Sequence, residues 1–191
     1  MLDHRSCFAC ANHDRGVRPV IRSFILGALL LAAACSPQAA RCDLSHTRDI
    51  AFTGGATADR VIVRTFGASC DKIIGVYEIV DGDGHPIWAW ASPLPRAFGD
   101  AFSAGEPEHV EAFLEQWSQP LLTTTQAAPE WALLAAGQTT LDELTYGDIR
   151  ARDLPMLCHF SGTARQTCVF WEPAAGGAGL LFDRDVEETV E

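Results

Sequence analysis

The stretch 73–92 constrains the fold of this chain more than any other part of the sequence. Two strongly apolar, β-prone runs flank an Asp-Gly-Asp-Gly turn sequence at 81–84. Aspartate first and glycine fourth suit a type I turn that ends in a left-handed residue, because glycine adopts a positive φ at no steric cost. The stretch therefore predicts a β-hairpin in which Asp81 lies opposite His85.

Continuing this register along both strands predicts which side chains share a face. It places Ile79 opposite Ile87, Glu78 opposite Trp88, Tyr77 opposite Ala89 and Val76 opposite Trp90. One face then carries Ile74, Val76, Val80, Trp88 and Trp90, and the other carries Gly75, Tyr77, Ile79, Ile87, Ala89 and Ala91. Because both faces are largely apolar, we expect a strand pair buried on two sides. The side with glycine and alanines is flat enough for a helix to lie against it.

Tyr77, Trp88 and Trp90 raise a second possibility for the hairpin, an aromatic surface that binds a glycan or a peptide. Two tryptophans at i and i+2 of one strand share a face, and on an apolar strand pair that face more often belongs to the core. The binding interpretation therefore requires these rings to be exposed as one patch.

The same turn begins like an EF-hand calcium loop, with Asp81 and Asp83 at alternate positions. His85 follows as the third ligand position, but an EF-hand needs glycine next and an acid at its twelfth position. Those two positions hold Pro86 and Ser92. We interpret the segment as a turn and expect no metal ion there.

The N-terminus has the pattern of an export signal. Residues 24–34 form an apolar run that is too short to span a bilayer as a helix, with basic residues before it and alanines at its end. The sequence Ala-Ala-Ala-Cys-Ser at 32–36 resembles the lipobox of bacterial lipoproteins, where signal peptidase II cuts before a lipid-modified cysteine. This family prefers leucine where Ala32 stands.

The resemblance implies a lipid at Cys35 that attaches the protein to a membrane, at the outer membrane or the periplasmic face of the envelope. Ser36 after the cysteine resembles cargo sent to an outer membrane. The same alanines also fit an ordinary signal-peptidase site, which would give a secreted or soluble periplasmic protein. The expected organisation is a signal peptide at 1–34, a tether at 35–57, one domain at 58–185 and a frayed acidic tail at 186–191.

Charge argues against one class of partner. The chain has 14 basic and 25 acidic residues, and removal of 1–34 leaves 10 and 23, a net charge of −13. Lys72 is the only lysine. Phosphate backbones would repel such a body, so nucleic acid is not an expected partner.

Four cysteines remain after Cys35, and an even number in an exported protein indicates two disulfides. Three pairings are possible. We favour the one with local loops, Cys42–Cys70 and Cys158–Cys168. No pair has the C-x-x-C spacing of a redox site.

Residues 60–66 alternate between apolar and polar side chains and predict a strand beside the 73–92 hairpin. Helices and a second β unit complete the expected fold. Residues 107–118 predict a helix with an apolar stripe, lying on the small-residue face of the hairpin. Further helices are expected at 129–136 and between 141 and 153, the latter with Thr140 in a capping box and with Leu144 and Ile149 buried. A hairpin of 156–160 and 166–172 follows, with a third run at 180–182. The fold class is α+β: a small antiparallel sheet built from two hairpins, braced by disulfides, with two or three helices packed on it.

Motifs that would indicate catalysis or a cofactor are missing from the sequence. The favoured function is a non-catalytic binding or structural role in the envelope, with an envelope protein or a glycan as partner. The alternative is a small hydrolase in which a histidine acts as base for a hydroxyl. Its candidate groups are His85 or His159, Asp81, Asp83 or Asp153, and Ser161 or Thr163.

Overall fold

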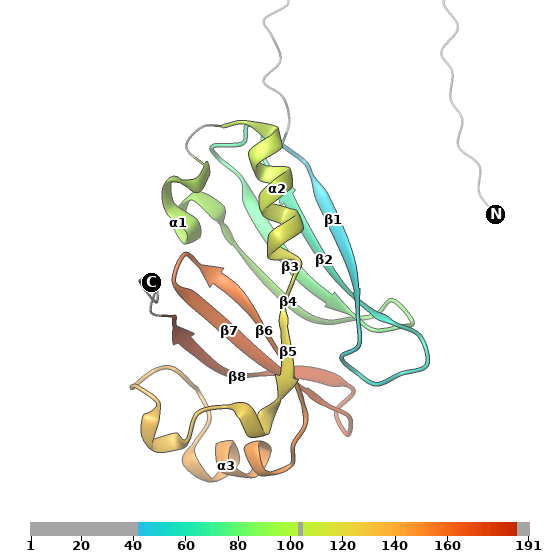
Figure 1. Cartoon of the computed structure of the whole chain (residues 1–191), viewed down its shortest axis with the longest axis vertical. Coiled ribbons are helices and arrows are strands. Elements are labelled where there is room, and N and C mark those ends of the chain that lie inside the picture. The colour runs from blue at the N-terminus through green and yellow to red at the C-terminus, as the bar shows by residue number, and fades with distance from the viewer. Residues whose placement is uncertain (1–41, 103–104, 187–191) are drawn as a thin grey trace, which may run out of the picture. The chain divides into compact units, whose positions relative to one another are not determined.

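A computed structural model describes residues 42–102 and 105–186 (Figure 1). The expected signal peptide, Cys35 and most of the acidic tail lie outside the described residues. Two four-stranded antiparallel sheets organise the domain. Sheet A contains β1 (Ser45–Ile50), β2 (Asp59–Phe66), β3 (Ile74–Val80) and β4 (Pro86–Pro93) in that order. Sheet B contains β5 (Leu121–Thr124), β6 (Pro155–Gly162), β7 (Arg165–Glu172) and β8 (Gly177–Asp185) in that order.

Three α-helices accompany the sheets in the part of the chain that the structure describes, so the α+β class is confirmed in its coarse form. They are α1 (Leu94–Phe98), α2 (Pro107–Trp117) and α3 (Glu143–Ala151). Single 3-10 turns occur at η1 (Gly99–Phe102), η2 (Thr125–Ala127) and η3 (Trp131–Leu133), the last in place of the helix expected at 129–136.

The expectation of one small sheet built from two hairpins missed two strands. β1 lies in the segment assigned to the tether, and β5 lies between the helices expected at 107–118 and 129–136, where no strand was expected. Both are edge strands, whose outer face meets solvent. β1 lacks the apolar run that marks a buried strand, and β5 is only four residues long. Each adds a fourth strand to its sheet.

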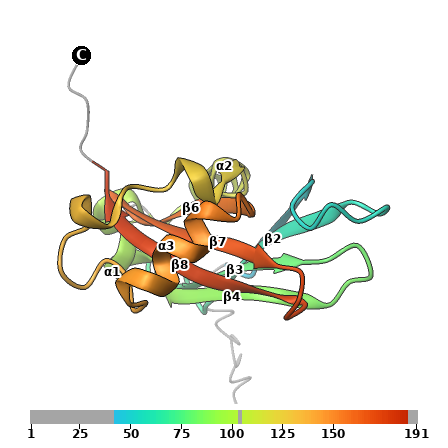
Figure 2. The ribbon, with the colours of Figure 1, turned by 90° about the horizontal axis from the view of Figure 1, so that it is seen from below.

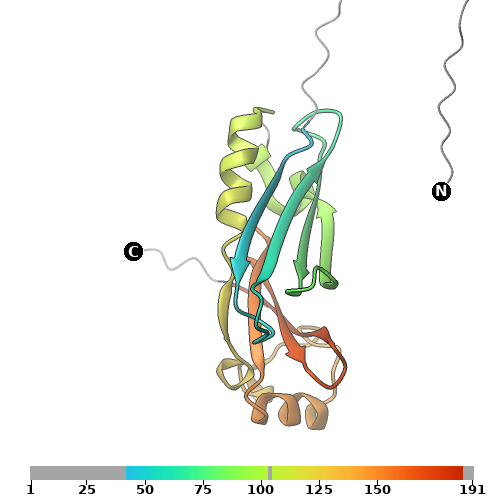
Figure 3. The same ribbon diagram turned by 90° about the vertical axis from the view of Figure 1, so that its right-hand side faces the viewer.

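The inner face of sheet A forms the larger core. Val61, Val63, Tyr77 and Ile79 pack there against α2 and against Leu157 and Val169 of sheet B. Figure 3 shows α2 along this face of sheet A. The opposite face of sheet B packs against α3 in a second core (Figure 2). The two sheets therefore meet face to face over part of their length, and α2 covers part of the remainder.

The hairpin turn is confirmed in detail. Gly84 has a φ of 89° and its N–H donates to the carbonyl of Asp81 at 3.0 Å. The Asp81 N–H donates to the carbonyl of His85 at 2.9 Å, as the turn sequence predicts. The turn therefore follows from local residue chemistry alone.

The register beyond the turn was wrong by one residue. Val80 still lies opposite Pro86, but a β-bulge at Ile87 then places Ile79 opposite Trp88 and Tyr77 opposite Trp90. One extra residue moves every later side chain of β4 to the other face of the sheet.

The bulge changes which face is apolar. Trp88 and Trp90 join Tyr77 and Ile79 on the inner face, while Ala89 and Ala91 are exposed on the outer face. The hairpin is therefore buried on one face and not on two. Helix α2 lies on the inner face, closest to β1 and β2. This is the face of Tyr77 and Ile79 on which the helix was expected, but Ala89 and Ala91 are no longer part of it.

The helices differ in how well the sequence predicted them. Helix α2 begins at Pro107 as expected and buries Val110, Leu114 and Trp117. In α3, Leu144 is 86% exposed, contrary to expectation, whereas Tyr146 and Ile149 are buried. The helix also starts two residues later than a Thr140 cap would start it, because the Asp142 carboxylate accepts from the Thr145 N–H at 2.9 Å.

Both disulfides have the expected pairing. Cys42–Cys70 ties the start of the described chain to the loop between β2 and β3. Cys158–Cys168 joins directly opposed residues of β6 and β7. All four sulfurs belong to buried residues, so the bonds are part of the two cores.

Candidate functional site

His159 on β6 lies at the centre of an aromatic cluster between the two sheets. It is 2% exposed, and its ring stacks on Tyr77 with centroids 4.1 Å apart and an interplanar angle of 12°. Trp90 contacts it edge-on at 6.1 Å. The cluster exists because the bulge in β4 turns both tryptophans toward sheet B.

Both nitrogens of His159 are engaged. The Trp88 indole N–H donates to Nε2 at 3.4 Å, and Nδ1 donates to the carbonyl of Phe160 at 3.1 Å. This pattern requires a neutral imidazole with its proton on Nδ1. Burial lowers the pKa of His159 to about 4, although the Phe160 carbonyl and the Asp183 carboxylate oppose that shift. His159 is therefore a neutral structural residue at physiological pH.

Tyr77 lies beneath the surface and not on it. Its side chain is fully buried, and burial raises the pKa of its hydroxyl. Among the described residues, nothing within hydrogen-bonding distance partners that hydroxyl. Of the three residues expected to form a binding surface, Tyr77 is therefore not at the surface, which leaves Trp88 and Trp90.

A chain of hydroxyl groups lies beside the cluster. The Thr167 hydroxyl is 2.9 Å from the Ser161 hydroxyl and 2.5 Å from Oδ1 of Asp183. Thr167 has one proton, so it donates to the carboxylate and accepts from Ser161. Arg165 pairs with the other carboxylate oxygen at 3.1 Å. The chain leads from Ser161 to an ion pair and makes no hydrogen bond with His159.

A hollow of about 390 Å³ opens where this chain meets β4. Trp88 and Trp90 are half-buried and form one wall, so the two rings are accessible from the hollow as well as packed on the core. The other lining residues are Ala91, Ser92, Arg96, Ala97, Ser161, Arg165, Thr167, Leu180 and Asp183. We call this the tryptophan hollow. It combines two aromatic rings with hydroxyl, carboxylate and guanidinium groups.

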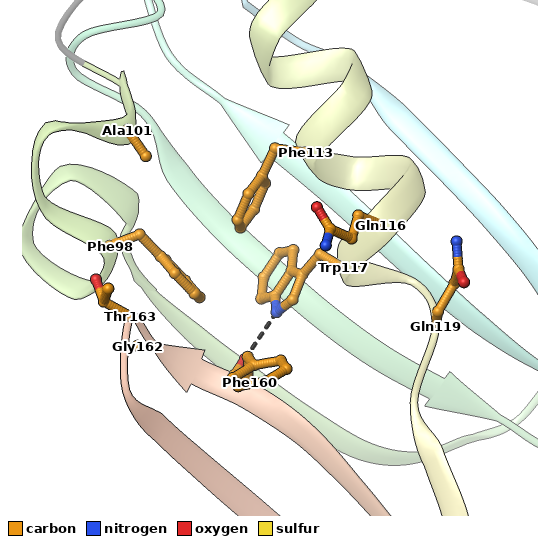
Figure 4. Close-up of a pocket in the computed structure, with 9 residues that line it drawn as sticks. All are labelled: Phe98, Ala101, Phe113, Gln116, Trp117, Gln119, Phe160, Gly162 and Thr163. Atoms are coloured by element: carbon orange, nitrogen blue, oxygen red, sulfur yellow. Dashed lines mark hydrogen bonds between the residues drawn. The ribbon is translucent and has the colours of Figure 1, made fainter. Parts of the chain in front are cut away.

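An apolar groove of about 460 Å³ lies between α1, α2 and the end of β6 (Figure 4). Phe98, Phe113 and Trp117 converge on it, and Phe160 is 43% exposed at its edge. The Trp117 indole N–H donates to the Phe160 carbonyl at 2.7 Å and fixes the ring. Its polar residues are two glutamines and Thr163, so the groove has no charged group with which to orient a ligand.

The Asp81–Asp83–His85 turn brings three potential ligand atoms within 4.8 Å of one another. The Asp81 carboxylate already accepts from the N–H groups of Asp83 and His85, at 3.0 and 2.8 Å. The bond from the His85 backbone holds the pKa of Asp81 below its ordinary value. The geometry is that of a turn stabilised by its first aspartate.

The structure brings together only part of the groups considered for a hydrolase. Ser161 and His159 lie on one strand, and the carboxylate near them is Asp183, which the sequence did not single out. His85 lies in the β3–β4 turn and pairs with Asp81. Asp153, with a φ of 55°, lies in the connection between α3 and β6. In the sequence, Asp183 follows the short apolar run 180–182, which was the one local feature that predicted strand β8.

Comparison with protein-family models, with curated proteins and with solved structures finds no match to this chain. Within the described part of the chain, no helix has the length and apolar character needed to cross a membrane.

Proposed function

We propose that the mature chain is an exported, lipid-anchored envelope protein with a non-catalytic binding role. The tryptophan hollow is the ligand site, and a glycan is the ligand class that suits it. The observation that supports this proposal is the lining of the hollow. Trp88 and Trp90 form one wall, and the Ser161–Thr167–Asp183 hydrogen-bonded chain forms the other.

The chemistry of the lining favours a sugar. Indole rings offer a flat apolar face for the C–H side of a pyranose ring. Because the rings line a concave site, sugar binding removes both the indole face and the sugar face from water. Hydroxyl and carboxylate oxygens accept from sugar hydroxyls, while Arg96 and Arg165 donate to sugar oxygens. The two indole rings are also held in place, because the Trp88 N–H donates a hydrogen bond to His159 and Trp90 packs edge-on against Trp117.

Two features support binding without catalysis. A general base must reach the proton that it removes, and His159 has both nitrogens engaged elsewhere. Its low pKa reflects burial, and His159 is 2% exposed and does not line the hollow. The hydrolase alternative would need His159 to break its bond with Trp88 and approach Ser161.

Export is supported by the lipobox-like sequence at 32–36 and by two buried disulfides, which form in oxidising compartments. We expect mass spectrometry of the protein extracted from membranes to find Cys35 as the first residue, carrying acyl groups. Recovery of peptides from residues 1–34 in the mature protein would rule out the anchor. An unmodified N-terminus at Cys35 would indicate the soluble alternative.

The ligand site is tested by substituting a tryptophan that forms one wall of the hollow. Trp90→Ala should weaken binding of soluble oligosaccharides from bacterial cell-wall glycan about tenfold, the factor that ~1.4 kcal/mol of lost stacking represents. Isothermal titration calorimetry provides the measurement. Trp131→Ala is the matched control, because Trp131 packs on Tyr146 in the other core. Equal loss in both variants would contradict the assignment of the hollow.

A further inference from the structure

The outer face of sheet A carries an exposed apolar patch at one end. Phe66 and Ile74 are opposed residues of β2 and β3, 50% and 48% exposed. Pro93 lies opposite Ile74 on β4 and is also exposed. Cross-strand partners point to the same face, so these side chains form a row across three strands. We call this row the end patch.

The end patch lies where the N-terminal segment joins the domain. The N–H of Cys42 donates to the carbonyl of Gly67, the residue after Phe66, at 3.2 Å. The disulfide to Cys70 holds this junction to the β2–β3 loop. Figure 1 shows the start of β1 at this end of the domain and α3 at the other.

The chain between Cys42 and the proposed lipid is short. Cys35 lies seven positions before Cys42, which spans at most about 25 Å when fully extended. A lipid at Cys35 therefore keeps this end of the domain close to the bilayer surface and raises its effective concentration there. The disulfide holds Cys42 to the domain. Residues after Cys42 therefore cannot detach from the sheet and lengthen the tether.

We propose that the end patch is a membrane-docking surface that seats sheet A on the bilayer to which Cys35 is anchored. The proposal rests on the proposed lipidation. Phe66 and Ile74 enter the interfacial region, where exposed apolar side chains are stabilised. Lys72 adjoins Asp71 and Arg64 pairs with Glu78 at 3.5 Å, while the Asp43 carboxylate, which accepts from the Gly67 N–H at 3.1 Å, adds a negative charge beside the patch. Docking is therefore driven by apolar contact, and a larger fraction of anionic lipid should weaken it because the body is acidic.

The test uses the acylated protein in vesicles of phosphatidylethanolamine and phosphatidylglycerol. Its other cysteines are acylated or in disulfides, so Ile74→Cys supplies a single free thiol for an environment-sensitive fluorophore such as NBD. We expect the emission of this label to shift to the blue and to rise in vesicles. The same label at Leu144→Cys, an exposed position on α3, should keep the emission that it has in water.

A second substitution measures the contribution of the patch. Phe66→Ser should lower the ratio of docked to undocked label at residue 74 about tenfold, since ~1.4 kcal/mol of apolar burial is a factor of ten. Leu133→Ser, a similar change at an exposed site far along the chain, should leave the ratio unchanged.

Equal emission from the labels at 74 and 144 in acylated protein would overturn the docking proposal and leave the anchor standing. A response at 74 only after membrane proteins are added would also overturn it, because the patch would then bind a protein. Absence of acyl groups on Cys35, read from the mass spectrum of the same sample, would remove both the anchor and the docking.

Discussion

Replacing Cys42 and Cys70 together by alanine should lower the free energy of unfolding by about 3–4 kcal/mol. The disulfide closes a loop with a sequence separation of 28 residues, and the chain-entropy relation gives a loss of that size. The bond also fixes the junction at which β1 begins, since the Cys42 N–H and carbonyl are bonded to Gly67 and Thr65. Urea unfolding followed by circular dichroism measures the change.

Cys158 and Cys168 provide the matched control for this prediction. Their alanine double variant also removes two buried sulfurs, but the sequence separation is only 10. The same relation predicts a smaller loss of about 2–3 kcal/mol. A larger loss for the short loop than for the long one would show that packing around the sulfurs, and not loop closure, sets the contribution.

The second large effect is acid destabilisation through His159. Its pKa is about 4 in the folded protein and near 6.5 when the chain is unfolded, because burial disfavours the imidazolium. Above the unfolded value both states are neutral and the contribution to stability is complete. As the pH falls through the interval between the two values, the unfolded state binds a proton that the folded state does not. The free energy of unfolding should therefore fall by about 2 kcal/mol between pH 7 and pH 5.

Two variants isolate this effect. His159→Phe keeps a ring against Tyr77 and cannot take up a proton, so its unfolding free energy should lose the contribution between pH 7 and pH 5, whatever its stability at pH 7. His159→Leu, which also cannot take up a proton, should lose the same contribution. An unchanged slope in the phenylalanine variant would mean that another group accounts for the acid sensitivity.

Local chemistry explains the parts of the fold that the sequence predicted. The 81–84 turn, the Pro107 helix start and the two disulfides depend on residues close together in the chain. The bulge at Ile87 does not, since it is set by how Trp88 and Trp90 fill the space under sheet B. Edge strand β1 was missed because its polar composition matches that of a loop, and β5 was missed because it has only four residues.

Only the tryptophan half of the candidate site could be predicted from the sequence. Trp88 and Trp90 were singled out because they are two residues apart on one predicted strand and therefore share a face. Their partners come from β6, β7 and β8, about 70 to 90 positions later, and Thr167 and Asp183 belong to no motif. A hydroxyl chain of this kind is visible only once strand pairing places Thr167 opposite Asp183.

The most direct test of the binding site uses the five tryptophans as internal reporters. Each indole N–H gives its own signal in a two-dimensional NMR spectrum of the ¹⁵N-labelled protein. On titration with soluble cell-wall oligosaccharides, we expect the Trp88 and Trp90 signals to move and saturate together, while the Trp131 and Trp171 signals stay in place and the sugars remain intact. Motionless Trp88 and Trp90 signals, or cleavage of the sugars during the titration, would contradict this expectation.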